Sequence, residues 1–254
     1  MDDEKLNIRI IAVMNFTYIL LSLFGLSACI QLLYYLFIFR KVNSFKKKET
    51  GFNKEVSIVV CGYNEAENLK VLIPKILEQD YPYFQLIIVN DQSNDDTKMI
   101  LKQWEYHPRV KIVTITDDIP KRVGKKFALT LGIKAAKYDY LLLTDADCVP
   151  VDDQWITSMV SSFCEKTQIV LGYGAYQKKK GLLNMLVRFD TFLVALQYFS
   201  YSLIGKTYMG VGRNLAYKKS LFFDNKGFAS HLHVPSGDDD LFIREVATTQ
   251  NTTI

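Results

Sequence analysis

Two clusters of aspartates carry the side chains in this sequence that are best suited to chemistry. Asp145 and Asp147, one residue apart, end the stretch LLLTDAD, and Asp238 begins three consecutive aspartates in SGDDDLF. Carboxylate oxygens are hard ligands that suit Mg²⁺ or Mn²⁺, which are often held by one or two carboxylates together with substrate phosphates. A carboxylate that holds no cation can accept a proton as a general base. The two clusters raise the possibility of one site that uses both properties.

Each cluster also has an ordinary structural interpretation. Asp, Asn and Ser favour turns and helix caps, and acids are stabilised at helix N-termini, where a helix from Leu241 would place the second cluster. Asp-x-Asp by itself is a weak motif. The sequence contains neither a Walker-type Gly-rich loop nor a GxGxxG fingerprint, so a nucleotide would not be held in either of those ways.

The elements that must position these residues alternate along the chain. Short β-branched or leucine-rich runs predict strands, and apolar residues at helical spacing predict helices between them. Pro74 predicts a kink or an early end in the first of these helices. The alternation predicts an α/β fold with a mostly parallel central sheet and helices on both faces. The strands are expected at residues 55–64, 84–91, 109–116 and 138–147, and the helices at 65–79, 94–107 and 125–138.

Polar residues collect where three of the predicted strands end. The first strand runs into Tyr63-Asn64-Glu65, the second into NDQSNDDT at residues 90–97, and the fourth into the Asp-x-Asp cluster. Ligands of open α/β sheets bind beyond the carboxyl ends of the strands. One such cluster would be an ordinary turn, and Asp95 and Asp96 are expected to be helix caps. Three clusters at one edge favour a binding site.

Several segments, in this order, resemble a known family. They are VSIVVCGYNEAENL, LIIVNDQSNDDT, GKKFALTLGIKAA, LLLTDADCVP, and GVGRNLAYKK followed by SGDDDLF. Their order is similar to that in family-2 glycosyltransferases, which are inverting nucleotide-sugar enzymes of the GT-A fold. The resemblance covers roughly residues 55–245. It implies a GT-A type sheet and a nucleotide-sugar donor, of which UDP-sugars are the commonest in the family.

The resemblance assigns five residues to the nucleotide. Tyr63, Glu65 and Asp91 match the positions that hold the base and the ribose. Ser93 lies in the same loop as Asp91, and Lys125 matches the Gly-Lys pair that lies near the nucleotide.

The resemblance also implies roles for the acidic clusters. Asp145 would face the ribose or the metal, and Asp147 would hold Mg²⁺ or Mn²⁺ on the diphosphate. Asp239 matches the catalytic base, with Asp238 in the acidic position before it, although the register of the three adjacent acids is ambiguous by one position. Arg213 is expected on the acceptor side, as a contact to phosphate or acceptor.

The N-terminal part of the sequence predicts a membrane anchor. Residues 10–39 contain no charge, and a helix needs about 20 apolar residues to cross a bilayer, so we expect an uncleaved transmembrane helix rather than a buried core helix. Five basic residues follow it within residues 40–48, against two within residues 1–9, which predicts a cytoplasmic catalytic domain. The chain thus divides into a tail at 1–9, the span at 10–39, a basic linker at 40–54 and a glycosyltransferase domain at 55–254.

A second apolar stretch, residues 181–205, is interrupted by Arg188 and Asp190. A charge near the bilayer centre costs several kcal/mol, so this stretch is not expected to be a second span. Two alternatives stay open. It is an amphipathic helix on the membrane surface, with Lys178–Lys180 meeting anionic headgroups, or it is a buried helix of the domain.

The expected function is inverting transfer of a sugar to a lipid-linked or polysaccharide acceptor at the cytoplasmic face of the membrane. The net charge of +4, with 31 basic and 27 acidic residues, is too mild to favour a nucleic-acid partner. The chain stops soon after Asp239, so we expect a form truncated at the C-terminus. The alternative function is therefore a catalytically impaired or non-catalytic homologue that acts as a membrane partner. A nucleotidyltransferase would need a phosphate-cradling Gly-rich loop, which is not found.

Overall fold

The structure is a computed structural model that describes residues 2–46, 54–116, 124–234 and 236–254; of residues 2–6, 8 and 9 it describes the backbone only. The chain divides into two compact units, Met1–Phe45 and Lys46–Ile254. The predicted linker at 40–54 falls largely outside the described residues, since 47–53 belong to none of these ranges.

The N-terminal unit is helical throughout its described length. Helix α1 (Asp2–Leu33) continues through a π-helical turn, η1 (Tyr34–Phe39), into α2 (Arg40–Ser44). The segment Ile10–Ser44 is long and apolar enough to cross a membrane, and its side chains are almost all exposed within the unit. The helix continues through Ser44, past the end that the sequence predicted at residue 39, because the basic residues after it are also good helix formers.

Among the described residues, seven strands form one mixed sheet in the order β3-β2-β1-β4-β6-β5-β7. The pairs β3–β2, β2–β1 and β1–β4 are parallel, as the alternation of strands and helices predicted. Strand β6 is antiparallel to both of its neighbours, β4 and β5. The strands are β1 (Val56–Gly62), β2 (Phe84–Asp91), β3 (Val110–Ile115), β4 (Tyr140–Asp145), β5 (Ile169–Leu171), β6 (Leu215–Lys218) and β7 (Thr252–Thr253).

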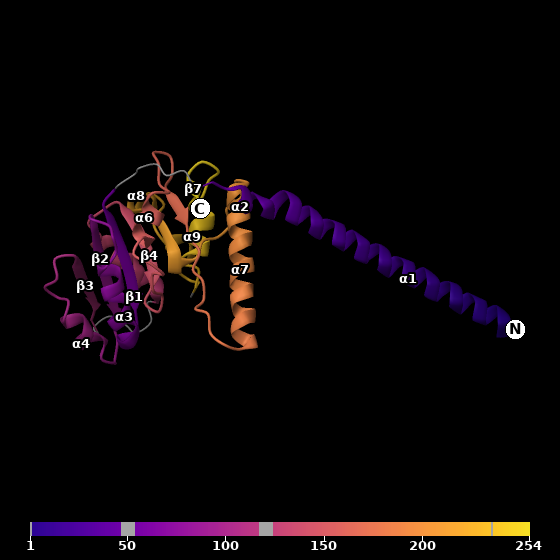
Figure 1. Cartoon of the computed structure of the whole chain (residues 1–254), viewed down its shortest axis with the longest axis horizontal. Helices are drawn as coiled ribbons and strands as arrows, with labels where there is room; N and C mark the ends of the chain where they lie inside the picture. The colour runs from indigo at the N-terminus through magenta and orange to yellow at the C-terminus, as the bar shows by residue number, and fades with distance from the viewer. Residues whose placement is uncertain (1, 47–53, 117–123, 235) are drawn as a thin grey trace. The chain divides into compact units, whose positions relative to one another are not determined.

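Helices cover both faces of this sheet, as predicted (Figure 1). Successive side chains of a strand point to opposite faces, so in β1 the alternate residues Ile58 and Val59 belong to two different cores. One core is completed by α3 (Ala66–Leu77), α4 (Thr97–Lys102) and α6 (Trp155–Val160). The other is completed by α5 (Lys125–Ala135), α7 (Leu182–Leu203), α8 (Lys219–Asp224) and α9 (Asp240–Val246).

The observed bounds correct several sequence-based ones. Helix α3 contains Pro74 and still runs on to Leu77, so the proline does not end it early. The helix predicted at 94–107 is only α4, Thr97–Lys102, because turns follow it. Strands β5, β6 and β7 were not predicted. They have only two to four residues each, too few for an alternating pattern to be recognised.

Candidate active site

The site begins where three adjacent parallel strands end. Gly62 of β1 pairs with Asn90 of β2, and Cys61 of β1 pairs with Asp145 of β4. Because parallel strands that lie side by side end at one edge of the sheet, the polar residues after β1 and β2 and the aspartate that ends β4 gather there. The structure therefore brings together the three polar clusters that the sequence placed at strand ends.

The loops after β1 and β2 are joined by hydrogen bonds. The amide of Asn64, a residue with φ of 58°, donates to Ser93 Oγ at 2.9 Å, and the amide of Asn94 donates back to Asn64 Oδ1 at 2.7 Å. The amide of Thr97, the first residue of α4, donates to Asp95 Oδ1 at 3.0 Å, which is the capping role predicted for Asp95, and the amide of Ala66, the first residue of α3, donates to Asp95 Oδ2 at 3.2 Å. Asp96 holds the N-cap position of α4, but its side chain makes no capping hydrogen bond there. These bonds fix the two loops as one rim.

The residues predicted to hold the nucleotide differ in their environments along this rim. Tyr63 is 55% exposed, and its hydroxyl accepts from Asn94 Nδ2 at 3.3 Å. Glu65 accepts from Asn68 Nδ2 at 2.6 Å. Asp91 is half-buried at the end of β2, and burial raises the pKa of its carboxyl above the ordinary value. Ser93 is buried, and its hydroxyl oxygen accepts the hydrogen bond from the Asn64 amide described above, so Ser93 helps to hold the two loops together.

The antiparallel strand β6 delivers a further segment to this edge. Leu215 of β6 pairs with Leu143 of β4, so the residues that precede β6 lie beside the end of β4. The hydroxyl of Thr144 donates to the carbonyl oxygen of Arg213 at 3.0 Å and fixes this arrangement. Because β6 runs antiparallel to β4, Gly212 and Arg213, which precede β6, lie beside Asp145 at the end of β4.

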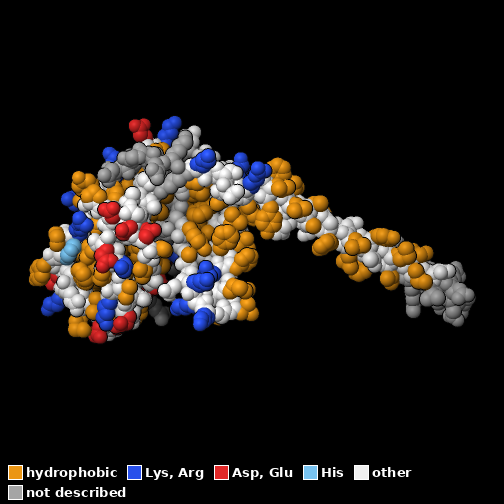
Figure 2. Space-filling view, in the orientation of Figure 1, with side chains coloured by type: hydrophobic (Ala, Val, Ile, Leu, Met, Phe, Trp, Pro, Cys, Tyr) orange, Lys and Arg blue, Asp and Glu red, His pale blue; other side chains and the backbone are white. Residues whose placement is uncertain are grey.

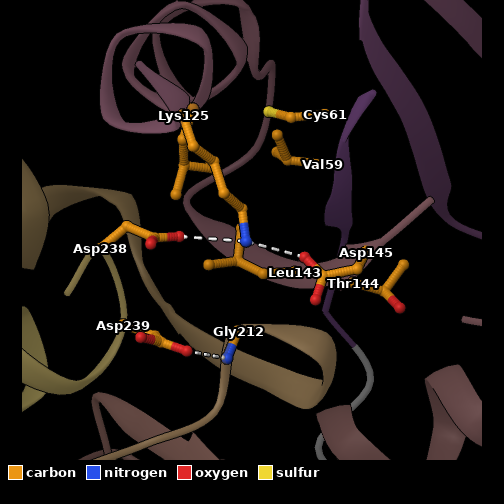
Figure 3. A pocket seen from close by; sticks show the side chains of 10 residues that line it. Val59, Cys61, Lys125, Leu143, Thr144, Asp145, Gly212, Asp238 and Asp239 are labelled. Atoms are coloured by element: carbon orange, nitrogen blue, oxygen red, sulfur yellow. Dashed lines mark hydrogen bonds and ion pairs between the residues drawn. The ribbon is translucent and has the colours of Figure 1, made fainter. Parts of the chain in front are cut away.

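The two aspartate clusters line one pocket, and Lys125 lies between them (Figure 3). Lys125 Nζ is 2.9 Å from Asp145 Oδ1 and 3.2 Å from Asp238 Oδ2. Burial disfavours the charged ammonium, but the Asp145 and Asp238 carboxylates outweigh burial and raise the pKa of Lys125. The lining residues are Val59, Cys61, Lys125, Leu129, Leu143, Thr144, Asp145, Gly212, Asp238 and Asp239.

Two backbone amides hold Asp239 in this pocket. Its Oδ2 accepts from the amide of Gly212 at 2.7 Å, and its Oδ1 accepts from the amide of Asp240 at 2.8 Å. Asp239 is also the N-cap of α9, so the helix-terminus interpretation is confirmed, and it is compatible with the site interpretation. Each oxygen keeps a further lone pair that can accept a proton or a hydrogen bond.

The pocket distinguishes three acids that the sequence left in doubt. Asp238 is largely buried and paired with Lys125, whereas Asp239 is held by amides and has no cation among its partners in the described part of the chain. Asp240 does not line the pocket; its Oδ1 accepts from the amide of Leu241 at 2.9 Å. Of the three acids, Asp239 is therefore the one that lines the pocket and whose carboxylate is not paired with a cation of the described residues.

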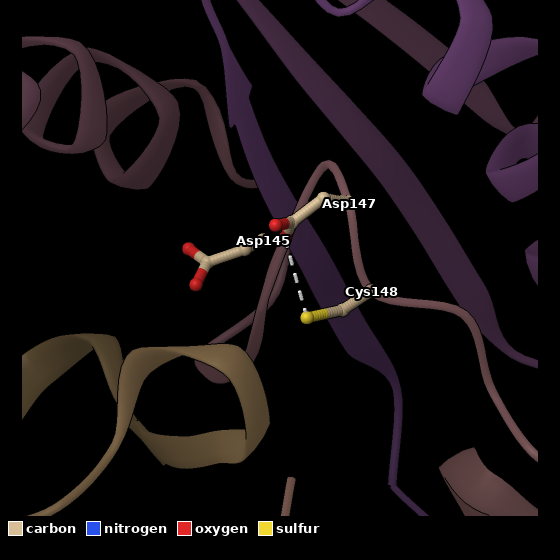
Figure 4. Close-up of side chains that lie close together, drawn as sticks. All are labelled: Asp145, Asp147 and Cys148. Carbon is tan, nitrogen blue, oxygen red and sulfur yellow. Dashed lines mark hydrogen bonds between the residues drawn. The ribbon is translucent and has the colours of Figure 1, made fainter. Parts of the chain in front are cut away.

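The residues at the end of β4 and directly after it fit a divalent cation. Ligand atoms of Asp145, Asp147 and Cys148 all lie within 4.8 Å of one another (Figure 4). Burial, with Asp147 and Asp145 close by, raises the pKa of the Cys148 thiol to about 12. A sulfur is also a soft ligand, which suits a hard cation poorly. The two carboxylates are the donors that suit Mg²⁺ or Mn²⁺, and they leave other positions for phosphate or water.

Arg213 lies under the segment that follows β5. Its guanidinium carbon is 5.2 Å from the centroid of the Tyr176 ring, and its buried Nε has no hydrogen-bond partner among the described residues. A Cβ at Gly174 would lie 2.5 Å from Arg213 Cγ, so only a glycine at position 174 lets the Arg213 side chain occupy its position. Arg213 does not line the pocket described above, but the strand-end turn that it belongs to does, through Gly212.

Two contributors to the site were missed from the sequence. The amide of Gly212 holds Asp239, and the buried Lys126 donates to the carbonyl oxygens of His231 at 2.7 Å and Val234 at 3.0 Å. Lys126 thereby anchors the loop that leads to the second aspartate cluster. The sequence offered one signal, two adjacent lysines at the start of a helix, where positive charge is unfavourable unless acids or carbonyls lie opposite.

A family model, related sequences and solved structures all match this chain, and each of them describes a glycosyltransferase or a polysaccharide synthase. The model of the family described as glycosyl transferase family 2 matches residues 57–224. The poly-beta-1,6-N-acetyl-D-glucosamine synthase of Staphylococcus epidermidis is 30% identical over 159 residues, which are 61% of this chain and 37% of that protein. The chain therefore spans well under half the length of the curated relatives it matches.

Two solved structures share the fold. A mannosyltransferase from Pyrobaculum calidifontis, in complex with GDP-Man and Mn²⁺, aligns with a TM-score of 0.66 at 21% identity, over 91% of this chain and 65% of that one. A structure of S. aureus TarS in complex with UDP-GlcNAc aligns with a TM-score of 0.51 at 18% identity, over 76% and 53%.

Proposed function

This chain belongs to glycosyl transferase family 2, as its motifs predicted, and we propose that it transfers a sugar from a UDP-sugar to the hydroxyl of a lipid-linked or polysaccharide acceptor, with inversion, at the cytoplasmic face of a membrane. One observation carries the proposal. Asp145 and Asp239, from clusters far apart in the sequence, line the same pocket at the carboxyl end of the parallel strands, with Lys125 beside them.

The donor's nucleotide would bind along the rim formed by the loops after β1 and β2. Tyr63 offers an exposed ring, and Asp91 and Glu65 offer carboxylates to ribose or base. The curated relatives are N-acetylglucosamine polymer synthases, and one structure of the same fold holds UDP-GlcNAc. These names support UDP-GlcNAc as the first donor to test.

Asp145 and Asp147 would hold Mg²⁺ or Mn²⁺ against the donor diphosphate. When bound, such a cation neutralises charge on the departing nucleoside diphosphate. The chain's own contribution on this side is Lys125, whose ammonium already lies between two carboxylates and is in place to donate to a phosphate oxygen.

Asp239 would act on the acceptor. The acceptor oxygen attacks the anomeric carbon from the face opposite the diphosphate, and Asp239 takes the proton of the hydroxyl. The bond from the anomeric carbon to the diphosphate oxygen breaks, and its electron pair leaves with UDP. A single displacement of this kind inverts the configuration. The two backbone amides on Asp239 fix the carboxylate so that it need not reorient during the reaction.

The membrane side of the proposal is supported by the helix Ile10–Ser44, which is long and apolar enough to cross a bilayer. Basic residues are in excess after this helix, and such an excess stays on the cytoplasmic side. Cleavage of residues 46–254 by protease added to right-side-out membrane vesicles would contradict this orientation.

The test is release of UDP by the purified full chain, with an acceptor-free and an acceptor-containing arm. We expect release from a UDP-sugar in Mg²⁺ or Mn²⁺, its loss in EDTA, and its loss in Asp147→Ala. Asp224→Ala is the matched control, because Asp224 is an exposed acid at the end of α8, outside the pocket. Release that survives EDTA and Asp147→Ala would overturn the metal assignment. No release from any UDP- or GDP-sugar would favour a non-catalytic homologue.

A further inference from the structure

Helix α7 is divided into two halves with different surroundings. Its second half packs into the domain: Ala195 and Tyr198 are buried, and the Tyr198 hydroxyl donates to the carbonyl oxygen of Gly172 at 2.8 Å. The first half, up to Phe192, is mostly exposed. The sequence left two alternatives open, a buried helix and a surface helix. The second half of α7 is therefore the buried helix, and the first half lies at the surface.

The exposed half carries a continuous apolar face, which we call the α7 stripe. Its residues recur at the spacing i, i+3, i+4, i+7 and i+10, which places them on one side of a helix. Large apolar residues exposed singly are normal on soluble proteins, whereas a contiguous group marks an interaction surface. The stripe consists of Leu182, Met185, Leu186, Phe189 and Phe192, which are 67%, 57%, 52%, 61% and 52% exposed.

Basic residues border the stripe where the helix begins. Lys178, Lys179 and Lys180 are exposed immediately before α7. Figure 2 shows Lys or Arg side chains next to hydrophobic side chains over the lower end of α7. Lys178–Lys180 are not a loose tail. Asn184 in the first turn accepts from the amide of Lys179 at 2.8 Å, and its Nδ2 donates to the carbonyl oxygen of Gln177 at 3.1 Å. The lysine segment is thus fixed next to the apolar face.

This combination fits the surface of an anionic bilayer. An apolar helix face with basic residues at its border lies in the interface plane, where the apolar side chains enter the acyl boundary and the lysines reach the headgroups. Leu182–Leu203 is long and apolar enough to cross a membrane, but packing argues against a crossing. A span needs about 20 residues, and Ala195 and Tyr198 in the second half of α7 are part of the domain core. Arg188 and Asp190 within the exposed half add to the cost of crossing.

The chain itself favours lipid over a second protein as the occupant. Residues 45–55 join the candidate span Ile10–Ser44 to β1, and a linker of that length reaches at most about 40 Å. A domain tethered so closely to a bilayer meets lipid at high local concentration. We propose that the α7 stripe is seated in an anionic membrane surface, with Lys178–Lys180 contacting lipid headgroups.

Such a seat would orient the pocket. The segment that leads into α7 passes over Arg213, which stacks on Tyr176 at 5.2 Å, and Arg213 adjoins Gly212 of the pocket lining. The membrane contact is thereby linked to the acceptor side of the site through one short stretch of chain. The proposal does not depend on catalysis, since an inactive chain would seat itself in the same way.

The experiment places a photo-crosslinking amino acid, p-benzoylphenylalanine, at position 189 of the full chain in vesicles rich in phosphatidylglycerol. The matched control carries it at position 106, because Tyr106 is 91% exposed and lies beyond α4 at the β3 edge of the sheet, whereas α7 contacts β7 at the other edge. Both positions are exposed, so both variants are expected to fold. Adducts are identified by mass spectrometry.

We expect lipid adducts at position 189 and few at position 106. Lys178→Glu, Lys179→Glu and Lys180→Glu together should lower the adduct yield about tenfold or more in these vesicles, and leave it unchanged in phosphatidylcholine vesicles, since basic residues bind anionic leaflets. Equal lipid labelling at the two positions, or no lipid adduct at 189, would overturn the proposal. So would a predominant covalent dimer, which would show that a second copy covers the stripe.

Discussion

Replacing Asp239 with Asn tests the catalytic assignment most directly. The carboxylate accepts one backbone amide on each oxygen, from Gly212 at 2.7 Å and from Asp240 at 2.8 Å. An asparagine side chain keeps one acceptor oxygen and presents an NH₂ group to the second amide. The substitution therefore removes both the negative charge that would take a proton and one of the two hydrogen bonds that hold it.

The size of each effect follows from these contacts. A hydrogen bond to a charged group contributes roughly 1.5–3 kcal/mol, so Asp239→Asn should lower the free energy of unfolding by about that amount. Loss of a general base lowers the rate by about 10²- to 10⁴-fold. The loss of rate is thus larger than a small unfolded fraction can explain. The dissociation constant for the donor should change little, because the donor's nucleotide is assigned to the rim after β1 and β2.

The assay compares kcat for sugar transfer, the donor dissociation constant and the urea unfolding curve of the same preparations. Asp240→Asn is the matched control. Asp240 is the next residue in the chain and accepts one backbone amide, from Leu241 at 2.9 Å, but does not line the pocket. An asparagine at 240 keeps the one acceptor oxygen that this bond needs, so we expect little change in stability and little loss of kcat. Full turnover by Asp239→Asn, or an equal loss of turnover in both variants, would refute the assignment of Asp239 as the base.

Two further substitutions test how the site is positioned. Lys125→Met removes the ammonium between Asp145 and Asp238. It should weaken UDP binding, measured by calorimetry, by about 10- to 100-fold, because one charge-assisted hydrogen bond is lost. Unchanged affinity would show that Lys125 does not reach the donor. Gly132→Ala places a Cβ 2.6 Å from Val59 Cγ1 and 2.9 Å from Val89 Cγ2, so α5 must move off the sheet. It should lower the free energy of unfolding by about 1–3 kcal/mol in urea, and an unaltered midpoint would mean that the helix shifts without strain.

Local patterns in the sequence were sufficient for β1 to β4, the four strands that form the parallel part of the sheet. The run FQLIIVND predicted β2 with the bounds that the structure has, Phe84–Asp91, because its residues are apolar on both faces. Helix α5 and strand β4 were placed correctly, but the predicted ranges, 125–138 and 138–147, run past the observed ends, Lys125–Ala135 and Tyr140–Asp145. Helix and strand ends depend on caps and turns, which are weak signals compared with the periodicity of the interior.

The acidic residues illustrate what local pattern leaves open. Three adjacent aspartates have the same composition and nearly the same neighbours, so no count along the chain distinguishes Asp238 from Asp239. In the structure one is paired with Lys125 and the other with the amide of Gly212, a residue 27 positions away. Similarly, the hydropathy of α7 predicted a helix but not which half would be covered, because that depends on what packs against it.

The sequence alone determined the order of the first four strands and of the helices α3, α4 and α5 between them, the edge at which polar residues gather, and the family, since each of these depends on short segments of neighbouring residues. Only the tertiary structure decided which carboxylate is held free in the pocket and which is neutralised by an ammonium. That choice rests on the antiparallel pairing of β6, a strand of four residues, with β4. Contacts of this kind join residues that are far apart along the chain, and their register is set by the packing of the whole domain.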